Sequence, residues 1–183
     1  MLLEFDSSSP TSPQAMPISA YLKGLRDRIG HDLVMLTAVS ISVFDEKNRL
    51  LLGKNTETGL WMLPGGAIDP NEHPADAAVR ECQEETGLLV EPNATIGVFG
   101  GPEFLVKYPN GDLAYYITIA FRAALVGGAL VPNDGEMSAL QYFSFKECEM
   151  IHLEPASLVI ARQAFAHPSS TYFRPATWRP GVV

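Results

Sequence analysis

The sequence has few of the features that mark secreted or membrane-bound proteins. It contains only two cysteines, Cys82 and Cys148, and no CxxC pair, so no disulfide framework is expected. No apolar run approaches the roughly 18 residues that a membrane-spanning helix needs. The N-terminus is acidic and lacks the basic and long apolar segments of a secretory signal. We therefore expect a cytoplasmic protein that does not enter a membrane.

Basic residues are also scarce. The 183 residues include 13 Lys and Arg against 21 Asp and Glu, which gives a net charge of −8. A groove for nucleic acid needs clustered Lys and Arg, so nucleic acid is not an expected partner. The hydrophobic fraction of 46% and the charged fraction of 19% are ordinary for a globular protein, and the length suits one domain with a sizeable core.

The acidic residues concentrate in one stretch of the chain. Seven carboxylates and a single base, Arg80, lie between positions 69 and 91, which gives this window a charge of −6. The carboxylates are Asp69, Glu72, Asp76, Glu81, Glu84, Glu85 and Glu91. Such crowding of like charges predicts a counter-ion.

Composition and periodicity divide the chain into a mobile N-terminal arm (1–17), a folded domain (18–166) and a Pro-rich C-terminal tail (167–183). The predicted helices are 18–29, which ends at Gly30, 74–86 and 155–166. The predicted strands are 34–44, 49–53, 60–63, 96–99, 104–108, 115–124, 129–131 and 140–143. The first two strands, and the two around Asn110-Gly111, are predicted hairpins. This order predicts a mixed sheet covered by helices.

The helix predicted over 74–86 carries more carboxylates than stability alone explains. Pro74 suits its first position and Gly87 the position after its end. Its apolar stripe consists of Ala75, Ala78, Val79, Cys82 and Thr86. Glu81, Glu84 and Glu85 lie beside that stripe, near the negative end of the helix dipole, where crowded anions destabilise a helix. Either this is a solvated acidic face, or its oxygen atoms hold a hard cation such as Mg²⁺.

The stretch around this helix favours the cation. Gly66, Glu72, Arg80-Glu81, Glu84-Glu85 and Gly87-Leu88 follow the spacing G-x5-E-x7-R-E-U-x-E-E-x-G-U, where U is a bulky aliphatic residue. This pattern resembles the Nudix box, with Cys82 in the first aliphatic position as the one departure. A free cysteine packs as a small apolar residue, so the chemistry should be intact. The resemblance extends over roughly residues 34–166.

The resemblance implies a fold and a metal site. Nudix proteins are α/β/α sandwiches around a mixed β-sheet, and most hydrolyse a nucleoside diphosphate linked to another group. By that resemblance, Glu84 and Glu85 would be the main ligands of Mg²⁺ or Mn²⁺. Glu81 would complete the site or act on the attacking water. The Gly65 carbonyl is a further candidate ligand, and Gly66 would let the chain approach the ion, unless both glycines only form a tight turn.

Two further roles follow from the resemblance. Arg80 would orient the cluster by pairing with Glu72 and Glu81. The base that takes a proton from the attacking water is, in this family, either a box glutamate or an acid from a later loop. The candidates outside the box are, in order of preference, Glu136, Asp134 and Glu103.

The groups that bind the substrate are harder to place, because phosphates need Lys or Arg and bases need aromatic faces. The candidates for phosphate are Arg49, Lys54 and Lys107, and those for stacking are Phe104, Tyr108, Tyr115 and Tyr116. For Tyr115 and Tyr116, the alternative is ordinary alternation within a strand.

The sequence therefore predicts a Mg²⁺-dependent pyrophosphohydrolase of a small nucleotide such as ADP-ribose or a nucleotide sugar. Pro102, fifteen positions after Gly87, lies near where ADP-ribose-cleaving relatives often carry a proline. A (deoxy)nucleoside triphosphate is the alternative substrate. A non-catalytic nucleotide-binding module is a different class, but such modules usually lose box glutamates, which are all present here. Homodimerisation through the N-terminal helix or the C-terminal tail stays open.

Overall fold

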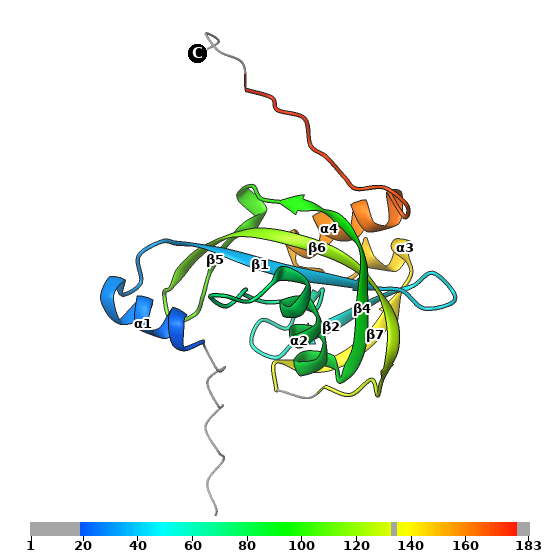
Figure 1. Ribbon diagram of the computed structural model, residues 1–183, viewed down its shortest axis with the longest axis horizontal. Coiled ribbons are helices and arrows are strands. Elements are labelled where there is room, and N and C mark those ends of the chain that lie inside the picture. Colours follow the sequence, from blue (N-terminus) through cyan, green and yellow to red (C-terminus); the bar gives the residue numbers. More distant parts are fainter. Residues whose placement is uncertain (1–18, 133–134, 179–183) are drawn as a thin grey trace, which may run out of the picture.

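Two β-sheets packed between helices form the body of the protein, which the computed structural model describes over residues 19–132 and 135–178 (Figure 1). The larger sheet has the order β1 (Val34–Val43), β6 (Leu113–Gly128), β4 (Leu88–Phe99), and β5 (Leu105–Lys107) also pairs with β6. The smaller sheet consists of β3 (Trp61–Met62), β2 (Leu50–Asn55) and β7 (Met137–Phe143). β1 and β6 run parallel and the other pairs antiparallel, so the predicted mixed α/β fold is confirmed. The predicted arm (1–17) and Asp134 lie outside the described residues.

Helices cover the strands from two sides. α2 (Pro74–Thr86) shares one core with β1, β2 and β4, α4 (Pro155–Ala166) shares a second with β2 and β4, and a smaller third cluster lies under the N-terminal helix. β2 serves both cores because alternate residues of a strand point to opposite faces, so Leu51 packs with α2 while Leu50 and Leu52 pack with α4. Two short helices, η1 (Pro102–Phe104) and α3 (Phe145–Cys148), lie in connections. α2 therefore has a rigid base on which to carry functional side chains.

The predicted hairpin of strands 34–44 and 49–53 is wrong. Among the described residues, β1 and β2 are joined by one isolated bridge, between Phe44 and Leu50, and then enter different sheets. The turn between them forms as predicted, with Asn48 in the left-handed region (φ 55°). Both strands are apolar on both faces, so alternation does not specify a partner. β1 pairs instead with β6, whose residues lie about eighty positions further along the chain.

The segment 129–131 was predicted as a strand, and it does not form one. Ala129 and Val131 donate their N–H groups to the carbonyl oxygens of Gly87 and Thr86, at 3.3 and 3.0 Å. The segment therefore covers the C-terminal end of α2 instead of extending a sheet. The predicted strand at 96–99 is longer than expected, because β4 starts at Leu88, directly after the end of the helix.

The N-terminal helix α1 (Ala20–Ile29) is fixed to the predicted turn between β5 and β6. Arg26 donates to the carbonyl oxygens of Asp32 and Leu113, at 2.7 and 2.8 Å. Its Nε also lies 3.4 Å from the Asp112 carboxylate, which His31 Nδ1 approaches to 2.6 Å. The His31 contact is the main cause that lowers the pKa of Asp112. None of the helices in the described part of the chain is long and apolar enough to cross a membrane.

Candidate active site

The candidate site is built on α2 and the loop before it. Pro74 lies in the first turn of the helix, and Gly87 ends it in the left-handed conformation (φ 72°). The buried face of α2 consists of Ala77, Ala78, Cys82, Glu85 and Thr86. The predicted stripe was therefore wrong at Ala75, which is exposed, and it missed Ala77 and Glu85. The face that buries Ala78 and Cys82 also turns Glu85 inward, where the Gly65 N–H of the preceding loop donates a hydrogen bond to its carboxylate.

The loop 64–68 lies along the edge of β1. The carbonyl oxygens of Pro64 and Gly66 accept from the N–H groups of Ile41 and Val39, both at 2.9 Å. Gly65 between them has φ 151°, and a Cβ there would collide with the β1 backbone. A Cβ on Gly66 would meet the Glu81 carboxylate at 2.6 Å. The two glycines thus do different things: Gly65 lets the loop lie on β1, and Gly66 leaves room for Glu81.

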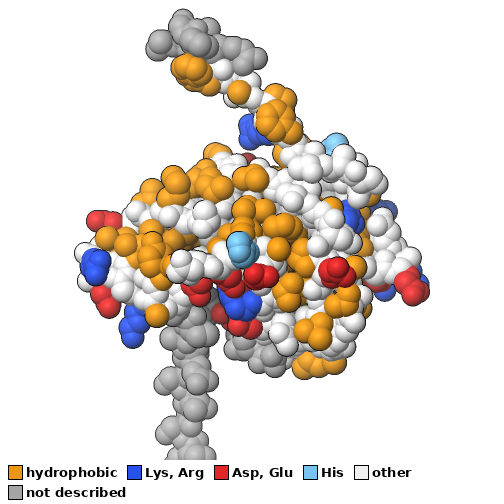
Figure 2. Space-filling model, viewed as in Figure 1, with side chains coloured by type: hydrophobic (Ala, Val, Ile, Leu, Met, Phe, Trp, Pro, Cys, Tyr) orange, Lys and Arg blue, Asp and Glu red, His pale blue; other side chains and the backbone are white. Residues whose placement is uncertain are grey.

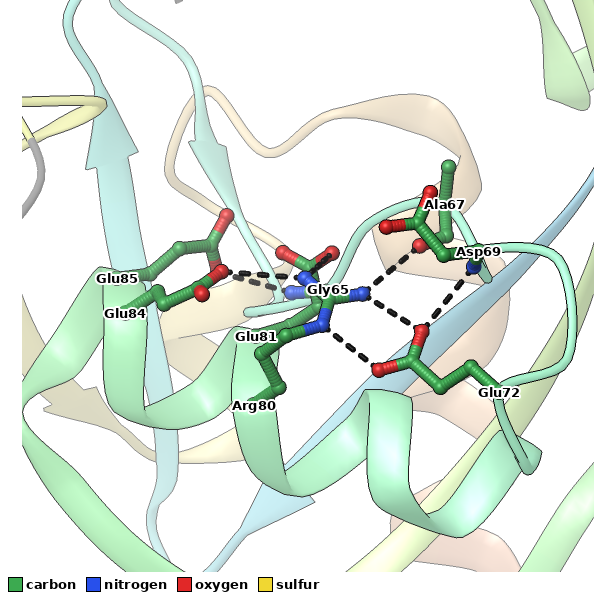
Figure 3. Close-up of polar contacts among 8 residues, drawn as sticks. All are labelled: Gly65, Ala67, Asp69, Glu72, Arg80, Glu81, Glu84 and Glu85. Atoms are coloured by element: carbon green, nitrogen blue, oxygen red, sulfur yellow. Dashed lines mark hydrogen bonds and ion pairs between the residues drawn. The ribbon is translucent and has the colours of Figure 1, made fainter. Parts of the chain in front are cut away.

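Arg80 is the centre of the carboxylate cluster (Figure 3). Its Nε and Nη2 donate to the two oxygens of Glu72, at 2.7 and 2.9 Å, and its Nη1 donates to Glu81 at 2.7 Å and to Glu84 at 3.1 Å. Nη2 also donates to the Ala67 carbonyl oxygen at 3.2 Å. The Arg80 hydrogen bonds are the main cause that lowers the pKa of Glu72. Arg80 therefore ties the helix to the loop, and one guanidinium faces three carboxylates.

Glu81 and Glu85 are the more enclosed carboxylates of the cluster. Glu85 is only 2% exposed, and its Oε2 accepts from the Gly65 N–H at 2.9 Å. Burial is the main cause that raises the pKa of Glu81, and the ion pair with Arg80 opposes it. Glu84, in contrast, keeps a side chain that is 53% exposed. The site thus presents carboxylates from the interior to the surface along one side of α2.

These residues fit a hard divalent cation by the chemistry of their donors. All of them are oxygen donors, and Glu72, Glu81, Glu84 and Glu85 carry four negative charges against the one positive charge of Arg80. Because Gly66 has no Cβ, the Glu81 carboxylate has room to lie against the loop. In the part of the chain that the structure describes, no three His, Cys, Asp or Glu side chains are arranged as a ready-made metal site. Arg80 instead holds the carboxylates, so a bound cation would have to compete with its hydrogen bonds.

The acids proposed outside the box lie in two places. Glu136 is half-buried at the start of β7, and its carbonyl oxygen accepts from Thr56 at 2.8 Å. Its loop starts beside the last turn of α2, because Val131 is bonded to Thr86. Glu103 is exposed in η1, and within the described residues no hydrogen bond or ion pair joins it to Arg80. The structure therefore places the Glu136 backbone beside Thr56, after the end of β2, and it is Val131, five residues earlier, that contacts the end of α2.

Most of the predicted substrate contacts are occupied elsewhere. Phe104 is 2% exposed and stacks on Phe99, with the ring centroids 6.4 Å apart, so it is a core residue and the predicted stacking role is wrong. Arg49 pairs with Asp45 at 2.7 Å within the turn after β1.

The tyrosines are partly buried, and the two lysines remain accessible. The hydroxyl groups of Tyr108 and Tyr116 lie 2.7 Å apart, and the Tyr115 hydroxyl accepts from Gly101 at 2.9 Å. Burial is the main cause that raises the pKa of Tyr108 and of Tyr116. Lys54 and Lys107 are exposed, on β2 and β5.

The structure thus combines a mixed α/β fold with a loop and a helix that gather glutamates around one arginine. The comparison with family models agrees and is more specific: residues 35–163 match the model of the NUDIX domain. The chain therefore belongs to the Nudix family, and the resemblance of its sequence motif is confirmed.

The contact of Arg80 with Ala67 was not predicted, because a backbone carbonyl leaves no mark in a sequence. The contact of Arg80 with Glu84 was not predicted either, although their spacing of four residues could have shown it.

Relatives and solved structures are similar over most of the domain. A Bacillus subtilis protein provisionally named 8-oxo-dGTP diphosphatase is 45% identical over 57% of this chain and 63% of its own length. An ADP-ribose pyrophosphatase of Methanocaldococcus jannaschii is 32% identical over 62% of this chain and 66% of its own. The chain thus aligns with slightly less than two thirds of each. A structure of the MutT protein from Methanosarcina mazei is 21% identical and superposes with a TM-score of 0.62, covering 76% of this chain and 99% of that one, which supports the fold.

Proposed function

We propose that this protein is a divalent-cation-dependent pyrophosphohydrolase that cleaves a nucleoside diphosphate linked to another group. The observation that carries the proposal is the cluster of Glu81, Glu84 and Glu85 on α2, where Arg80 holds Glu81 and Glu84 and the Gly65 N–H holds Glu85. Figure 2 shows the same arrangement at the surface, with acidic side chains around a basic one. Membership of the Nudix family, whose enzymes generally use a divalent metal, supports the same activity.

The residues of the site would divide the work as follows. Glu84 and Glu85, with the Gly65 carbonyl and Glu81, would hold Mg²⁺ or Mn²⁺. The bound cation would neutralise the diphosphate and make a coordinated water more acidic. A carboxylate within hydrogen-bond reach, from Glu81 or Glu136, then takes the proton of the attacking water onto one of its oxygens. Arg80 keeps Glu72 and Glu81 in place, and it acts on the substrate only through them.

ADP-ribose or a nucleotide sugar is the favoured substrate. The name of the Methanocaldococcus relative, an ADP-ribose pyrophosphatase, supports this choice. A nucleoside triphosphate is the second candidate, because the Bacillus relative at 45% identity bears the name of an 8-oxo-dGTP diphosphatase. We also propose a cytoplasmic location, in keeping with the free, buried thiols of Cys82 and Cys148.

A panel of nucleotides tests the proposal. ADP-ribose, a UDP-sugar, dGTP and 8-oxo-dGTP are incubated with millimolar Mg²⁺, and the products are separated by chromatography. AMP with ribose 5-phosphate would mark the first class, and a nucleoside monophosphate with diphosphate the second. Glu84→Gln and Glu85→Gln should lower kcat by at least about 10²-fold, as expected when a metal ligand or base is lost.

Glu91→Gln is the matched control, because Glu91 belongs to the same acidic stretch but is exposed on β4. It should keep wild-type turnover. Full activity of Glu85→Gln at saturating Mg²⁺, or turnover that survives EDTA, would refute the assignment of the site. Tight nucleotide binding without turnover would instead identify a non-catalytic module.

A further inference from the structure

The strand that leads into the loop 64–68 is held from two sides. β3 has only two residues, and it pairs with β2 on one side. On its other side lies the segment 152–154, which precedes α4. The Trp61 N–H donates to the His152 carbonyl oxygen at 2.9 Å, and the Trp61 carbonyl oxygen accepts from the Glu154 N–H at 2.8 Å. This segment therefore pairs with β3 as a short parallel strand.

The short parallel ladder ends where α4 begins. The next bond of such a ladder would run from the Leu63 N–H to the Glu154 carbonyl oxygen. That oxygen instead accepts from the Leu158 N–H at 2.9 Å, because the chain turns into the helix at this point. Leu63 is only 2% exposed, and a buried backbone N–H needs a partner. A different acceptor must therefore serve Leu63.

The side chain of Ser157, in the first turn of α4, is that acceptor. Its hydroxyl oxygen accepts from the Leu63 N–H at 3.0 Å, and the hydroxyl donates to the Glu154 carboxylate at 2.6 Å. Ser157 is only 4% exposed. Alanine would suit a buried position in a helix better than serine. The hydroxyl at this position is therefore explained by its bond to Leu63, and Glu154 orients it for that bond.

This bond lies close to the carboxylate cluster along the chain. Two residues after Leu63, the Gly65 N–H donates to Glu85 at 2.9 Å (Figure 3). Pro64 lies between them, and its ring fixes φ, so the backbone has few dihedral angles that could absorb a shift. β1 holds the loop from Pro64 onward, and Ser157 holds the residue before it. The position of the Gly65 N–H therefore depends on both.

We propose that Ser157, oriented by Glu154, is a positioning residue of the carboxylate site. Its bond to Leu63 fixes the entry of the loop, so that the Gly65 N–H meets Glu85. The Glu85 carboxylate is thereby held where it can bind the cation. Ser157 acts through the loop and not on the substrate. This inference rests on the proposed function, because it gives Ser157 a part in the same hydrolysis.

Steady-state kinetics with varied Mg²⁺ test the positioning role. Ser157→Ala should lower kcat about tenfold or more and raise the half-saturating Mg²⁺ concentration by a similar factor, as when groups that orient metal ligands are lost. KM for the nucleotide should stay within about twofold, because no contact with the substrate is removed. Glu154→Ala should act in the same direction. Glu154→Gln should stay close to wild type, because an amide oxygen still accepts from the Ser157 hydroxyl.

Ser144→Ala is the matched control. The Ser144 hydroxyl also donates to a glutamate three residues away, Glu147, at 2.7 Å, and this pair caps the start of α3. Loss of the cap should lower the melting temperature by a few degrees, as Ser157→Ala should. The entry of the loop 64–68 is untouched, so kcat and the half-saturating Mg²⁺ concentration should remain those of the wild type.

Amide hydrogen exchange gives a readout that needs neither nucleotide nor metal. In Ser157→Ala, the Leu63 amide should exchange about tenfold faster than in the wild type, the factor that corresponds to the loss of one hydrogen bond. The Gly65 amide should follow, because its position depends on that bond. Neither amide should change in Ser144→Ala beyond what the lower stability of the whole fold explains.

The outcomes separate this inference from the catalytic proposal. If nucleotides are hydrolysed but Ser157→Ala keeps the wild-type kcat and Mg²⁺ dependence, the positioning role is refuted and the catalytic proposal stands. An equal loss of kcat in Ser144→Ala would also refute it, since lower stability alone would explain both variants. A rise in KM at unchanged kcat would overturn it, because Ser157 would then act on the substrate. If the wild type hydrolyses no nucleotide, both proposals fall, and faster exchange at Leu63 would mark a purely structural bond.

Discussion

Replacement of Gly66 by alanine tests the site through a single methyl group. A Cβ at this position would lie 2.6 Å from the Glu81 carboxylate, whereas ordinary van der Waals contact starts near 3.4 Å. The carboxylate therefore has to move by about 0.8 Å, and its 2.7 Å hydrogen bond with Arg80 has to lengthen or break. Displacements of about 1 Å in an active site cost on the order of 10²-fold in rate. We expect Gly66→Ala to lower kcat by about 10- to 100-fold.

The fold should survive this change, because Gly66 does not need a positive φ and the atom in the way is the end of a flexible side chain. Its melting temperature should fall by only a few degrees. Two other glycines give matched controls. Gly65→Ala places a methyl group against the β1 backbone at φ 151°, so it should destabilise the protein strongly. Gly24→Ala, in open space on α1, should gain about 0.5–1 kcal/mol of helix stability and leave kcat unchanged.

The measurements are product formation from the best nucleotide of the panel and thermal unfolding of each variant. A Gly66→Ala protein with wild-type kcat would refute the reasoning, because the position of Glu81 would then not matter. A loss of stability as large as that of Gly65→Ala would also refute it, since the loop backbone and not the carboxylate would need the glycine.

Three further changes test other parts of the structure. Burial raises the pKa of the Cys82 thiol to about 11, so a thiol reagent at pH 8 should label it only after unfolding; inactivation that follows labelling of the native protein would contradict this. Asp112→Asn should lower the melting temperature at pH 7. Because the pKa of Asp112 lies below its usual 3.8, that difference should shrink as the pH falls through and below this value, and a difference that grows would be inconsistent. Without metal, Glu84→Gln should change the melting temperature little, because exposed ion pairs contribute about 0–1 kcal/mol, whereas Glu85→Gln should lower it; both should abolish the rise that Mg²⁺ causes.

The sequence predicted the parts of the site that depend on local spacing. Pro74 and Gly87 give the ends of α2. The Arg80–Glu84 pair was missed, although their four-residue interval places them on one helical face. The contact of Arg80 with Glu72 is different, because Glu72 lies in the loop before the helix. Helix geometry does not specify that pair, and the expectation came from the likeness to the Nudix box alone.

Partners that are distant in the chain were predicted less well. β1 carries apolar residues on both faces, so its sequence is equally compatible with a hairpin and with the parallel pairing to β6. Phe104 follows a Gly-Gly-Pro-Glu segment that reads as a surface loop, yet η1 turns its ring onto Phe99. The short helix α3 was missed although Ser144 and Glu147 form a capping box, because four residues give no periodicity.

The burial of Glu85 shows that the bounds of a helix can be predicted from the sequence while its rotation about its own axis cannot. Like charges on α2 favour an arrangement in which Glu81, Glu84 and Glu85 all face water. The loop 64–66 overrides this preference, because its bonds to β1 fix the Gly65 N–H where it can donate to Glu85. That hydrogen bond ties the Glu85 carboxylate to the loop, and Arg80 provides one positive charge opposite Glu81 and Glu84. A carboxylate cluster with this excess of negative charge is costly for stability alone, which is why we propose that it serves to bind a cation, and that the cation in turn attracts the anionic substrate.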